Sequence, residues 1–373
     1  MDLSLTETQH LFVDSVSRYL NSEYPLSHRQ TLVSTDLGYS EAHWQTFAEL
    51  GWTGLALPEA FDGLGGDLID RMLLHEQLGK GLVLEPFLAT LGLCVPAILW
   101  AGSDEQKEML LSPVATGQLS MAAALQEASD PLNLHAIETS ASTNDEGFIL
   151  SGTKSMVLNG TGADYLIASA SLDGAETPTL FIIPADAPGV VVEGYPLLDG
   201  YAAAEVRFES VQLPPSSQLG EASQGSQIID HMIAHGILCV SAEAVGAMEV
   251  LYQSTIDYTK DRVQFDHPLA EFQVVKHRLT DMFIEYNLAK SMCLKTTLLV
   301  NEQSPDASRH LHGLKYLVGK AGRFIGQNAV QLHGGMGMTE DLMVAHYFKR
   351  LTVIDALFGH TDIHLDAFVN APA

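Results

Sequence analysis

Hydrophobic residues recur every three to four positions in the first third of the chain, a spacing that predicts amphipathic helices. The first such series is Leu11, Phe12, Val16 and Leu20. Segment 41–52 repeats the spacing and ends at Gly51, a residue type that often terminates helices. After a glycine-rich loop at 57–67, helical periodicity resumes and continues through the apolar run 87–100. We therefore assign residues 1–117 to an N-terminal α-helical domain.

The pattern changes near residue 118, where short runs of β-branched and aromatic residues alternate with turn signals. These runs span 148–154, 164–171, 179–185, 190–198 and 204–214. The sequence Asn-Asp-Glu-Gly at 144–147 lies between two strand-like runs and predicts a hairpin turn. Short strands at this spacing are typical of a small antiparallel barrel or sandwich. Residues 118–222 are therefore predicted to form a middle β domain.

Long helical periods return from Gly225 onward. The predicted helices span 225–260, 268–301, 305–332 and 340–370, and Pro268 and Pro305 fall at their boundaries. Four long helices with short connections favour a bundle. Residues 223–373 are therefore predicted to form a C-terminal four-helix bundle domain, and the whole chain is predicted to belong to the α+β class.

The net charge and the composition limit the kinds of molecule that this protein is expected to bind. The 373 residues include 19 basic and 46 acidic residues, a formal net charge of −27, which argues against binding to nucleic acid or to an anionic membrane surface. The N-terminus shows neither a basic region followed by an apolar run nor a long uncharged apolar stretch, so we predict a cytoplasmic protein without a membrane span. Three widely separated cysteines in apolar surroundings are expected to be buried, reduced thiols.

Five segments in a fixed order then point to a family. They are LGWTGLALPEAFDGLGGD (50–67), LHEQLGKGLVLEPFLAT (74–90), LSGTK (150–154), RVQFDHPLAEFQ (262–273) and QLHGGMGMTEDLMVAHYFKR (331–350). Together they resemble the acyl-CoA dehydrogenase family over nearly the whole chain. Within that family, the region 346–359 looks most like the small subunit of pimeloyl-CoA-dehydrogenase-type and steroid-degrading heteromeric enzymes.

The resemblance implies oxidation of an acyl-CoA thioester to its trans-2-enoyl form with FAD as cofactor. In the family, a carboxylate base removes the α-proton while the β-hydride passes to the flavin. Electrons then leave to an electron-transferring flavoprotein. The implied partners are therefore acyl-CoA, that flavoprotein and homologous subunits of a tetramer.

The resemblance also implies a clamp that one subunit supplies to the FAD of its neighbour. Its first half carries the contact residues Arg262, Gln264, Phe265, Leu269 and Phe272. Arg262 offers a fork of donors to a pyrophosphate oxygen, and Asp266 replaces the usual glycine. Gln331, Gly334 and Gly335 match the second half, where glycines let a backbone approach a phosphate closely. Taken alone, these residues fit equally well a surface arginine and an ordinary helix-ending turn.

The half of the site that holds the flavin ring matches the family poorly. In the run 126–133 only Glu127 agrees with the family pattern, and Leu132 and Asn133 replace its serine and aspartate. The flavin-contacting Trp-Ile-Thr triplet is replaced by Met156, Val157 and Leu158. A leucine side chain cannot hydrogen-bond to the flavin. The ring-binding surface of this chain is therefore predicted to be incomplete.

Both usual positions of the catalytic base hold glycine. The family's Glu-Gly-Thr motif aligns with Gly359, His360 and Thr361, of which Thr361 keeps the family residue and is expected to contact FAD. The alternative base position is Gly236. Two substitutes can be proposed: Asp362, which lies three residues after the lost base position, and Glu243, because a carboxyl group in a largely apolar run is expected to have a raised pKa. The competing interpretations are a surface carboxylate for Asp362 and an ion pair for Glu243.

The histidines permit one further hypothesis. His360 and His364 have the i, i+4 spacing that can hold a metal, whereas His310 and His312 lie on different sides of a helix. No third ligand is evident in the sequence, so we predict no metal site.

Three functions follow from this reading. The first is a subunit that completes the FAD site of a catalytic homologue in a heterotetramer. The second is a self-sufficient homotetrameric dehydrogenase with a relocated base. The third is a non-catalytic binding or scaffold protein with the same fold.

Overall fold

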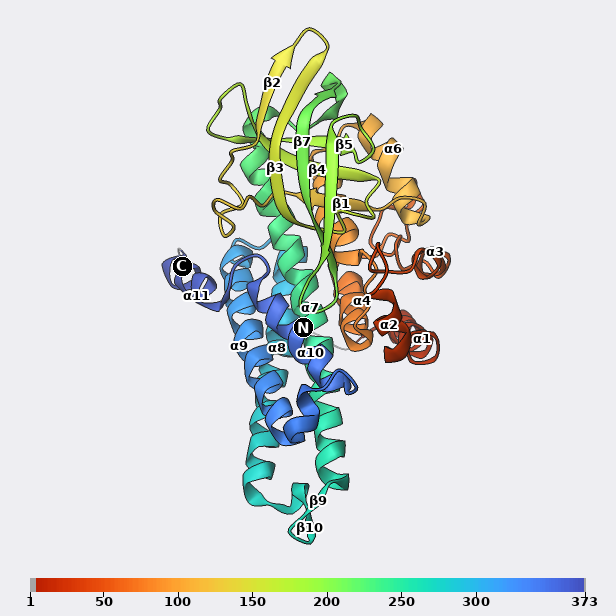
Figure 1. Ribbon diagram of the computed structural model, residues 1–373, viewed down its shortest axis with the longest axis vertical. Coiled ribbons are helices and arrows are strands. Elements are labelled where there is room, and N and C mark those ends of the chain that lie inside the picture. Colours follow the sequence, from red (N-terminus) through yellow and green to blue (C-terminus); the bar gives the residue numbers. More distant parts are fainter. Residues whose placement is uncertain (1–4, 372–373) are drawn as a thin grey trace. The chain divides into compact units, whose positions relative to one another are not determined.

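The computed structural model describes residues 5–371, which group into two units (Figure 1). Among the described residues, the helical unit comprises 5–29, Asp67–Val83 and 237–371. The strand unit comprises Gln30–Gly66 and Leu84–Gly236. The long helix α7 (Gly225–Asp261) contributes its first turns to the strand unit and the rest to the helical unit.

The helical unit is built around the C-terminal helices. Its elements are α1 (Glu7–Glu23), α4 (Leu68–Gly81), most of α7, α8 (Gln273–Asn301), α9 (Ala307–His333), α10 (Met343–Ala356) and α11 (Thr361–Asn370). Helix α9 packs against α8, α10 and α11, and α4 packs against α1 and α8. A short hairpin of β9 (Val263–Gln264) and β10 (His267–Pro268) joins α7 to α8. The first three predicted bundle helices are confirmed to within a few residues.

The fourth predicted helix, 340–370, is wrong as a single element. It is two helices, α10 and α11, separated by a turn in which Phe358 has φ 58° and Gly359 has φ 98°. Two consecutive residues in the left-handed region end the hydrogen-bond ladder of a right-handed helix. Apolar periodicity continues on both sides of this turn, which is why the pattern suggested one long helix.

Helices α4 and α7 touch through bare glycine backbones. A Cβ atom on Gly79 would lie 2.0 Å from the carbonyl oxygen of Glu243, and one on Gly246 would lie 1.9 Å from that of Glu76. Real side chains cannot occupy either position, so two glycines set the close approach of these helices. This crossing places Glu76 and Glu243 in the interior of the helical unit, where both are buried.

The strand unit contains a sheet of eight strands. They are β1 (Met121–Ala124), β2 (Ser140–Asn144), β3 (Gly147–Leu158), β4 (Tyr165–Leu172), β5 (Pro178–Pro184), β6 (Val190–Pro196), β7 (Ala202–Leu213) and β8 (Gln218–Leu219). The order is β6-β7-β3-β2-β4-β5-β8, with β1 beside β4. The pairs β1–β4 and β2–β4 are parallel and the others antiparallel. The five predicted strands and the hairpin at 144–147 are confirmed, whereas β1, β2 and β8 were not specified from the sequence.

Helices precede the sheet within the strand unit. They are α2 (Leu26–Leu32, shared with the helical unit), α3 (Glu41–Glu49), the π-helix Phe87–Cys94, α5 (Val95–Ala101) and α6 (Asp104–Ala115). Gly51, with φ 79°, follows the end of α3 as its sequence position indicated. The Thr90 hydroxyl donates to the carbonyl of Met121, and the Met121 amide donates to the Thr90 hydroxyl. These two bonds tie the π-helix to the first strand.

Two expectations from the sequence concern the cysteines and membrane-spanning segments. Cys94, Cys239 and Cys293 are free and buried, as predicted. Among the described residues, one helical segment, Ala222–Asp261, is long and apolar enough to cross a membrane, but 78% of its most apolar window is buried inside the protein. That burial is typical of a core helix, so the apolar character of α7 is explained by the packing of its neighbours.

Candidate functional site

The two halves of the predicted clamp meet in the helical unit. The rings of Tyr258 on α7 and His333 on α9 stack with centroids 4.2 Å apart and planes inclined by 24°. Arg262 follows Tyr258 by one helical turn, and its amide donates to the Tyr258 carbonyl at 2.9 Å. Gly334 follows His333 directly. The structure therefore brings together the two sequence segments that the clamp hypothesis requires.

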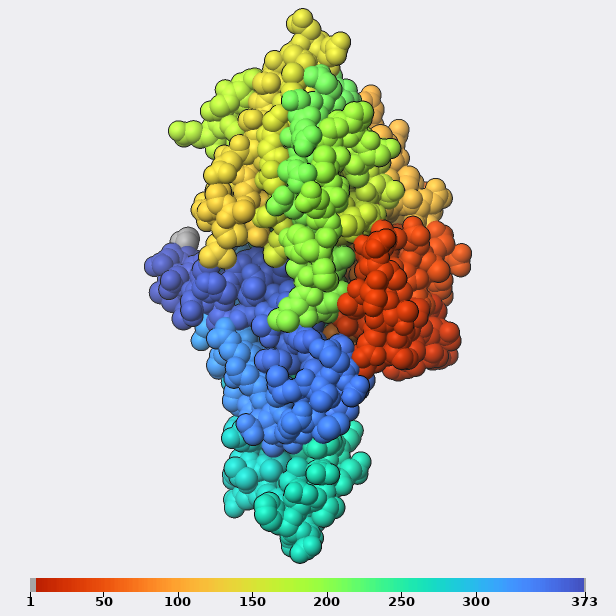
Figure 2. Space-filling model, viewed as in Figure 1, coloured from red at the N-terminus to blue at the C-terminus, as the bar shows by residue number. Residues whose placement is uncertain are grey.

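The first half of the clamp is the β9–β10 hairpin at the end of the α7–α8 pair (Figure 1). Its two turn residues, Phe265 and Asp266, have φ values of 55° and 62°, which are costly for residues other than glycine. The Phe265 side chain is 84% exposed, and its ring meets that of Phe272 edge-on at 6.2 Å. The surrounding segment lies at the surface in Figure 2. A strained turn that exposes an aromatic ring is typical of a contact site for another molecule.

The other residues of the hairpin fall into two groups. Arg262 and Gln264 are exposed, and the Gln264 amide donates to the carbonyl of Val263 at 2.8 Å. Leu269 and Phe272 are half-buried at the base of the hairpin. The guanidinium of Arg262 is therefore accessible to an anionic ligand.

The second half of the clamp is an open glycine turn. Gly334 caps α9 with φ 63° and ψ −145°, a conformation that glycine adopts readily. A Cβ atom on Gly334 or on Gly335 would meet no atom of the chain within 4 Å. Packing within this chain therefore does not require Gly335. Both glycines and Gln331 are exposed, which leaves room for a ligand or a second chain.

Thr361 lies apart from the hairpin, in a polar cluster at the start of α11. Its hydroxyl donates to Asp355 at 2.5 Å, and Asp355 also accepts from Arg323 at 2.5 Å. The buried Lys315 ammonium donates to the carbonyls of Asp355 and Gly359, both at 2.9 Å. Burial lowers the pKa of Lys315 to about 8. The Thr361 hydroxyl hydrogen is thus used within the chain, and its oxygen is left to act as an acceptor.

The histidines near the start of α11 do not form the pair that the i, i+4 spacing suggested. The Nε2 atom of His364 lies 2.9 Å from the carbonyl of Phe358, which only accepts, so Nε2 carries the proton. Its Nδ1 atom lies 3.0 Å from Nδ1 of His312, which must then donate. Burial lowers the pKa of His364 to about 4, so the ring is neutral near pH 7. The ring of His364 therefore pairs with His312 and not with His360. No group of three potential metal ligands occurs among residues 5–371.

Glu243, one of the two substitute bases, is bound in a buried ion pair. The Nε atom of Arg350 donates to one carboxylate oxygen at 2.6 Å, and a terminal nitrogen donates to the other at 2.8 Å. Glu243 is 4% exposed and Arg350 is 1% exposed. The ion-pair interpretation of Glu243 is the one that the structure supports. Both carboxylate oxygens are occupied, so this group is poorly placed to take a proton from a substrate.

The other three positions considered for the catalytic base are also poorly suited to that role. Asp362 is exposed in the first turn of α11, where a carboxylate stabilises the helix dipole. Gly236 is buried within α7. Gly359 has φ 98°, and its Cβ would approach the His364 ring at 3.2 Å. The backbone at this position is therefore shaped for glycine and disfavours a side chain that could serve as a base.

In the strand unit, the one residue that matches the family's flavin run has a structural role. Glu127 is buried and accepts hydrogen bonds from Lys154 at 2.6 Å and from the Thr139 amide and hydroxyl at 3.0 and 2.7 Å. Burial alone raises the pKa of the Glu127 carboxyl, but these hydrogen bonds outweigh it and hold that pKa below its ordinary value. Glu127 therefore fastens the loop 127–139 onto β3.

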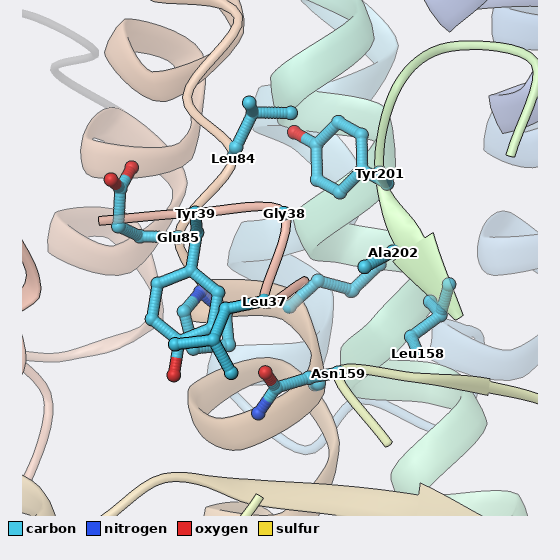
Figure 3. Close-up of a pocket in the computed structure, with 12 residues that line it drawn as sticks. Leu37, Gly38, Tyr39, Leu84, Glu85, Leu158, Asn159, Tyr201 and Ala202 are labelled. Atoms are coloured by element: carbon cyan, nitrogen blue, oxygen red, sulfur yellow. The ribbon is translucent and has the colours of Figure 1, made fainter. Parts of the chain in front are cut away.

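The strand in which Met156, Val157 and Leu158 replace the flavin-contacting triplet is irregular. Met156 has φ 50° at a bulge in β3, and its amide donates to the hydroxyl of Tyr195 at 3.0 Å. Val157 is buried in the core of the sheet. Leu158 lines a cavity of about 30 Å³, drawn in Figure 3, which is too small for a flavin ring.

That cavity is apolar with a polar end. Leu37, Leu84 and Leu158 form part of its wall, and Figure 3 shows the Tyr39 hydroxyl and the Asn159 amide near the same side. The Asn159 amide oxygen is buried without a hydrogen-bond partner, and burial raises the pKa of Tyr39 to about 12. None of the residues predicted to contact FAD lines this cavity.

Several residues that fix the geometry of these sites were not predicted from the sequence. Lys315 is buried on α9 and Tyr258 is half-buried on α7, and a polar residue at such a position signals a specific contact. Arg350 stands in the segment HYFKR, and arginine is mostly an exposed residue type. Its burial follows from the position of α10 against α9, which periodicity cannot specify.

Comparison with known proteins agrees with this architecture. Family models described as the N-terminal, middle and C-terminal domains of acyl-CoA dehydrogenase match residues 6–118, 122–211 and 223–371. A short-chain specific acyl-CoA dehydrogenase of Megasphaera elsdenii is 28% identical over 98% of both chains. The butyryl-CoA dehydrogenase structure from Megasphaera elsdenii has a TM-score of 0.91 at 26% identity, covering 99% of both chains.

A variant of the Tcur3481-Tcur3483 steroid ACAD has a TM-score of 0.89 at 26% identity, covering 98% of this chain and 97% of that one. The domain order, the fold and these likenesses agree over almost the whole length. The chain therefore belongs to the acyl-CoA dehydrogenase family, FAD-dependent oxidoreductases that act on the CH–CH bond of acyl-CoA thioesters.

Proposed function

We propose that this chain is one subunit of a heteromeric acyl-CoA dehydrogenase and supplies a clamp to FAD that a homologous catalytic subunit holds by its ring. The clamp consists of the Arg262–Phe272 segment and the turn at Gln331, Gly334 and Gly335. Thr361 is a further proposed contact, through its hydroxyl oxygen. The catalytic base and the surface for the flavin ring come from the homologous subunit.

One asymmetry carries the proposal. Arg262, Phe265, Gly334 and Gly335 are exposed, a Cβ atom on either glycine would meet no atom within 4 Å, and the hairpin turn that presents Phe265 is strained. By contrast, the base position Gly359 has a backbone shaped for glycine, and Glu243 is bound by Arg350. The residues that would contact FAD in a neighbouring subunit are retained, whereas a catalytic base for this chain's own site is absent from the usual positions.

The surface of α8 supports assembly with another chain. Ile284 and Leu288 lie one helical turn apart on the same side of α8 and are each about half exposed. Clustered apolar side chains on one exposed helix are typical of a protein–protein interface. A homologous subunit with the same fold is the partner that we propose for this surface.

The chemistry of the clamp follows from its side chains. Bound FAD supplies the two-electron oxidation that characterises the family. Arg262 provides charge-assisted donors for a phosphate oxygen. The Gly334 amide donates to the Gln331 carbonyl, but the lack of side chains at Gly334 and Gly335 lets a second phosphate oxygen approach the backbone of the turn closely. Phe265 provides an apolar face beside an aromatic ring. These groups bind and orient the cofactor, and none of them moves a proton of the substrate.

The wider setting is proposed from relatives. The substrate is an acyl-CoA thioester, and a steroid or other lipid acyl group is favoured by the similar steroid ACAD structure. The electron acceptor is an electron-transferring flavoprotein. We also propose a cytoplasmic location and no contact with nucleic acid, in keeping with a net charge of −27.

The test is to purify the chain alone and together with a full-motif acyl-CoA dehydrogenase homologue encoded nearby. Flavin absorbance per chain and enoyl-CoA formation are measured in both samples. Arg262→Gln is expected to weaken FAD binding by the complex about 10- to 100-fold, because it removes a charge-assisted hydrogen bond. Lys260→Gln is the matched control, since it removes an exposed charge two residues away. A fully active, FAD-loaded homo-oligomer of this chain alone would contradict the proposal.

The other two functions predict different results in the same experiment. A self-sufficient homotetramer turns over without a partner, and its activity is lost on Asp362→Asn while FAD stays bound. A scaffold protein shows no flavin absorbance alone or with any homologue. Gly335→Ala provides an independent check, because the added methyl group meets nothing within the chain and affects only a ligand or partner at the turn.

A further inference from the structure

The two halves of the clamp belong to segments far apart in the sequence, so something must set the distance between them. We propose that Tyr258 and His333 form a positioning pair that holds the Arg262 hairpin and the Gly334–Gly335 turn at the separation FAD requires. This inference rests on the proposed clamp function. It assigns a role to two residues outside the clamp itself.

The geometry of the pair supports a mechanical role. The rings stack at 4.2 Å with planes inclined by 24°, and the Tyr258 hydroxyl donates to the His333 carbonyl at 3.4 Å. Aromatic pairs at this distance add attraction beyond the area they bury. The contact therefore has two components, a ring stack and a longer hydrogen bond, that can be removed separately.

His333 is itself fixed within its helix. It is buried, and its Nδ1 atom donates to the carbonyl of Ala329 at 2.8 Å, one turn earlier in α9. Burial lowers the pKa of His333, so the ring is neutral near pH 7 and the stack does not depend on a charge. The carbonyl that accepts from Tyr258 is one of the last in α9, where helix carbonyls lack partners within the helix.

Both clamp halves start directly beside the pair. Arg262 is linked to Tyr258 by a backbone hydrogen bond of 2.9 Å, and the Arg262 carbonyl accepts from Leu269 at 2.8 Å to close the hairpin. On the other side, Gly334 follows His333 immediately and turns the chain with φ 63°. A displacement of one ring against the other therefore moves the arginine relative to the glycine turn.

Substitutions at Tyr258 separate positioning from general stability. Tyr258→Leu removes the stack and the hydroxyl, whereas Tyr258→Phe keeps the stack. In the co-purified complex, Tyr258→Leu is expected to weaken FAD binding about 10-fold, because binding groups displaced by about 1 Å lose much of their effect. Tyr258→Phe is expected to stay within about 3-fold of the unmodified complex, since the ring stack persists.

Tyr252→Leu is the matched control. Tyr252 is another α7 tyrosine, and it packs against Phe283 and Tyr286 on α8 instead of against His333. It is expected to leave FAD affinity unchanged. If Tyr258→Leu does not fold, His333→Leu and His333→Phe form an equivalent pair, of which only the first removes the stack. Equal FAD affinity in the leucine and aromatic variants overturns the inference.

A second measurement does not need FAD. Hydrogen exchange of the amides of Gly334–Met338 in the isolated chain is expected to accelerate in Tyr258→Leu and to stay unchanged in Tyr258→Phe and Tyr252→Leu. Unchanged exchange in Tyr258→Leu overturns the positioning role. If the unmodified complex binds no FAD, the proposed function fails, and the exchange rates alone decide whether the pair orders the glycine turn.

Discussion

Replacing Glu243 by glutamine is expected to destabilise the protein strongly, because it removes the carboxylate charge that binds the buried Arg350 guanidinium. Glutamine keeps the shape of the side chain, so the change is electrostatic. Arg350 is 1% exposed and donates to both carboxylate oxygens of Glu243. Removing one partner of such a buried pair costs about 3–5 kcal/mol. The corresponding loss in melting temperature is roughly 6–20 °C for a unit of this size.

The surroundings of the pair add to this cost. Arg71 and His75 lie in the same buried region, and the positive charges of Arg71 and Arg350 both disfavour protonation of His75. Loss of the Glu243 carboxylate removes negative charge beside two guanidinium groups and a neutral imidazole. The double change Glu243→Leu with Arg350→Met removes both charges and is expected to recover most of the lost stability.

Thermal and urea unfolding followed by circular dichroism measure the effect. Asp257→Asn is the control on the same helix, because Asp257 is exposed and its bond to Lys260 is a surface pair. The same variant separates two roles of Glu243. A structural ion pair predicts lost stability with normal turnover per folded complex. A Glu243→Gln protein that is as stable as the parent and binds FAD but does not turn over would refute the reasoning and restore Glu243 as a base.

Three further predictions concern backbone and pH. Gly359→Glu is expected to cost about 1–2 kcal/mol and to leave the isolated chain inactive, because φ is 98° at this position; a thermal melt and an enoyl-CoA assay check both points. Asp266→Gly is expected to stabilise the hairpin by about 0.5–1 kcal/mol, since glycine adopts a φ of 62° at lower cost than aspartate, and unfolding curves measure this. Burial, reinforced by Arg71 and Arg350, lowers the pKa of His75 to about 3, so the unfolded chain binds the extra proton below pH 6.5. The contribution of His75 is therefore complete above pH 6.5 and declines by about 1.4 kcal/mol per pH unit towards pH 3, and His75→Gln is expected to flatten the acid limb of a stability–pH profile.

The elements that the sequence predicted well are those with long, regular patterns. Helices α7, α8 and α9 have sustained apolar periodicity and proline or glycine near their ends, and the five longer strands consist of β-formers between turn residues. Strands β1 and β8 are short and take their identity from pairing with β4 and β5. The break between α10 and α11 depends on a left-handed Phe358, a conformation that no local preference of phenylalanine predicts.

The residues of the candidate site could be predicted from local motifs, but the contacts between distant residues could not. Arg262, Gly334 and Gly335 could be proposed from local motifs, because donor type and backbone freedom are properties of single residues. Their proximity could not, since Tyr258 and His333 are 75 positions apart. The same holds for Glu243 and Arg350, which are 107 positions apart and whose pairing changes a candidate base into a structural ion pair.

The sequence by itself determined the family pattern and the losses within it, because the residue type fixes which functional groups a side chain carries: a glycine side chain cannot remove a proton and a leucine side chain cannot hydrogen-bond. Tertiary structure decided which of the remaining polar groups are free to act. Burial and pairing depend on helices and strands that core packing brings together from distant parts of the chain. Glu127, Glu243 and Thr361 are engaged by such partners, whereas Arg262, Phe265 and Gly335 are left open to another molecule.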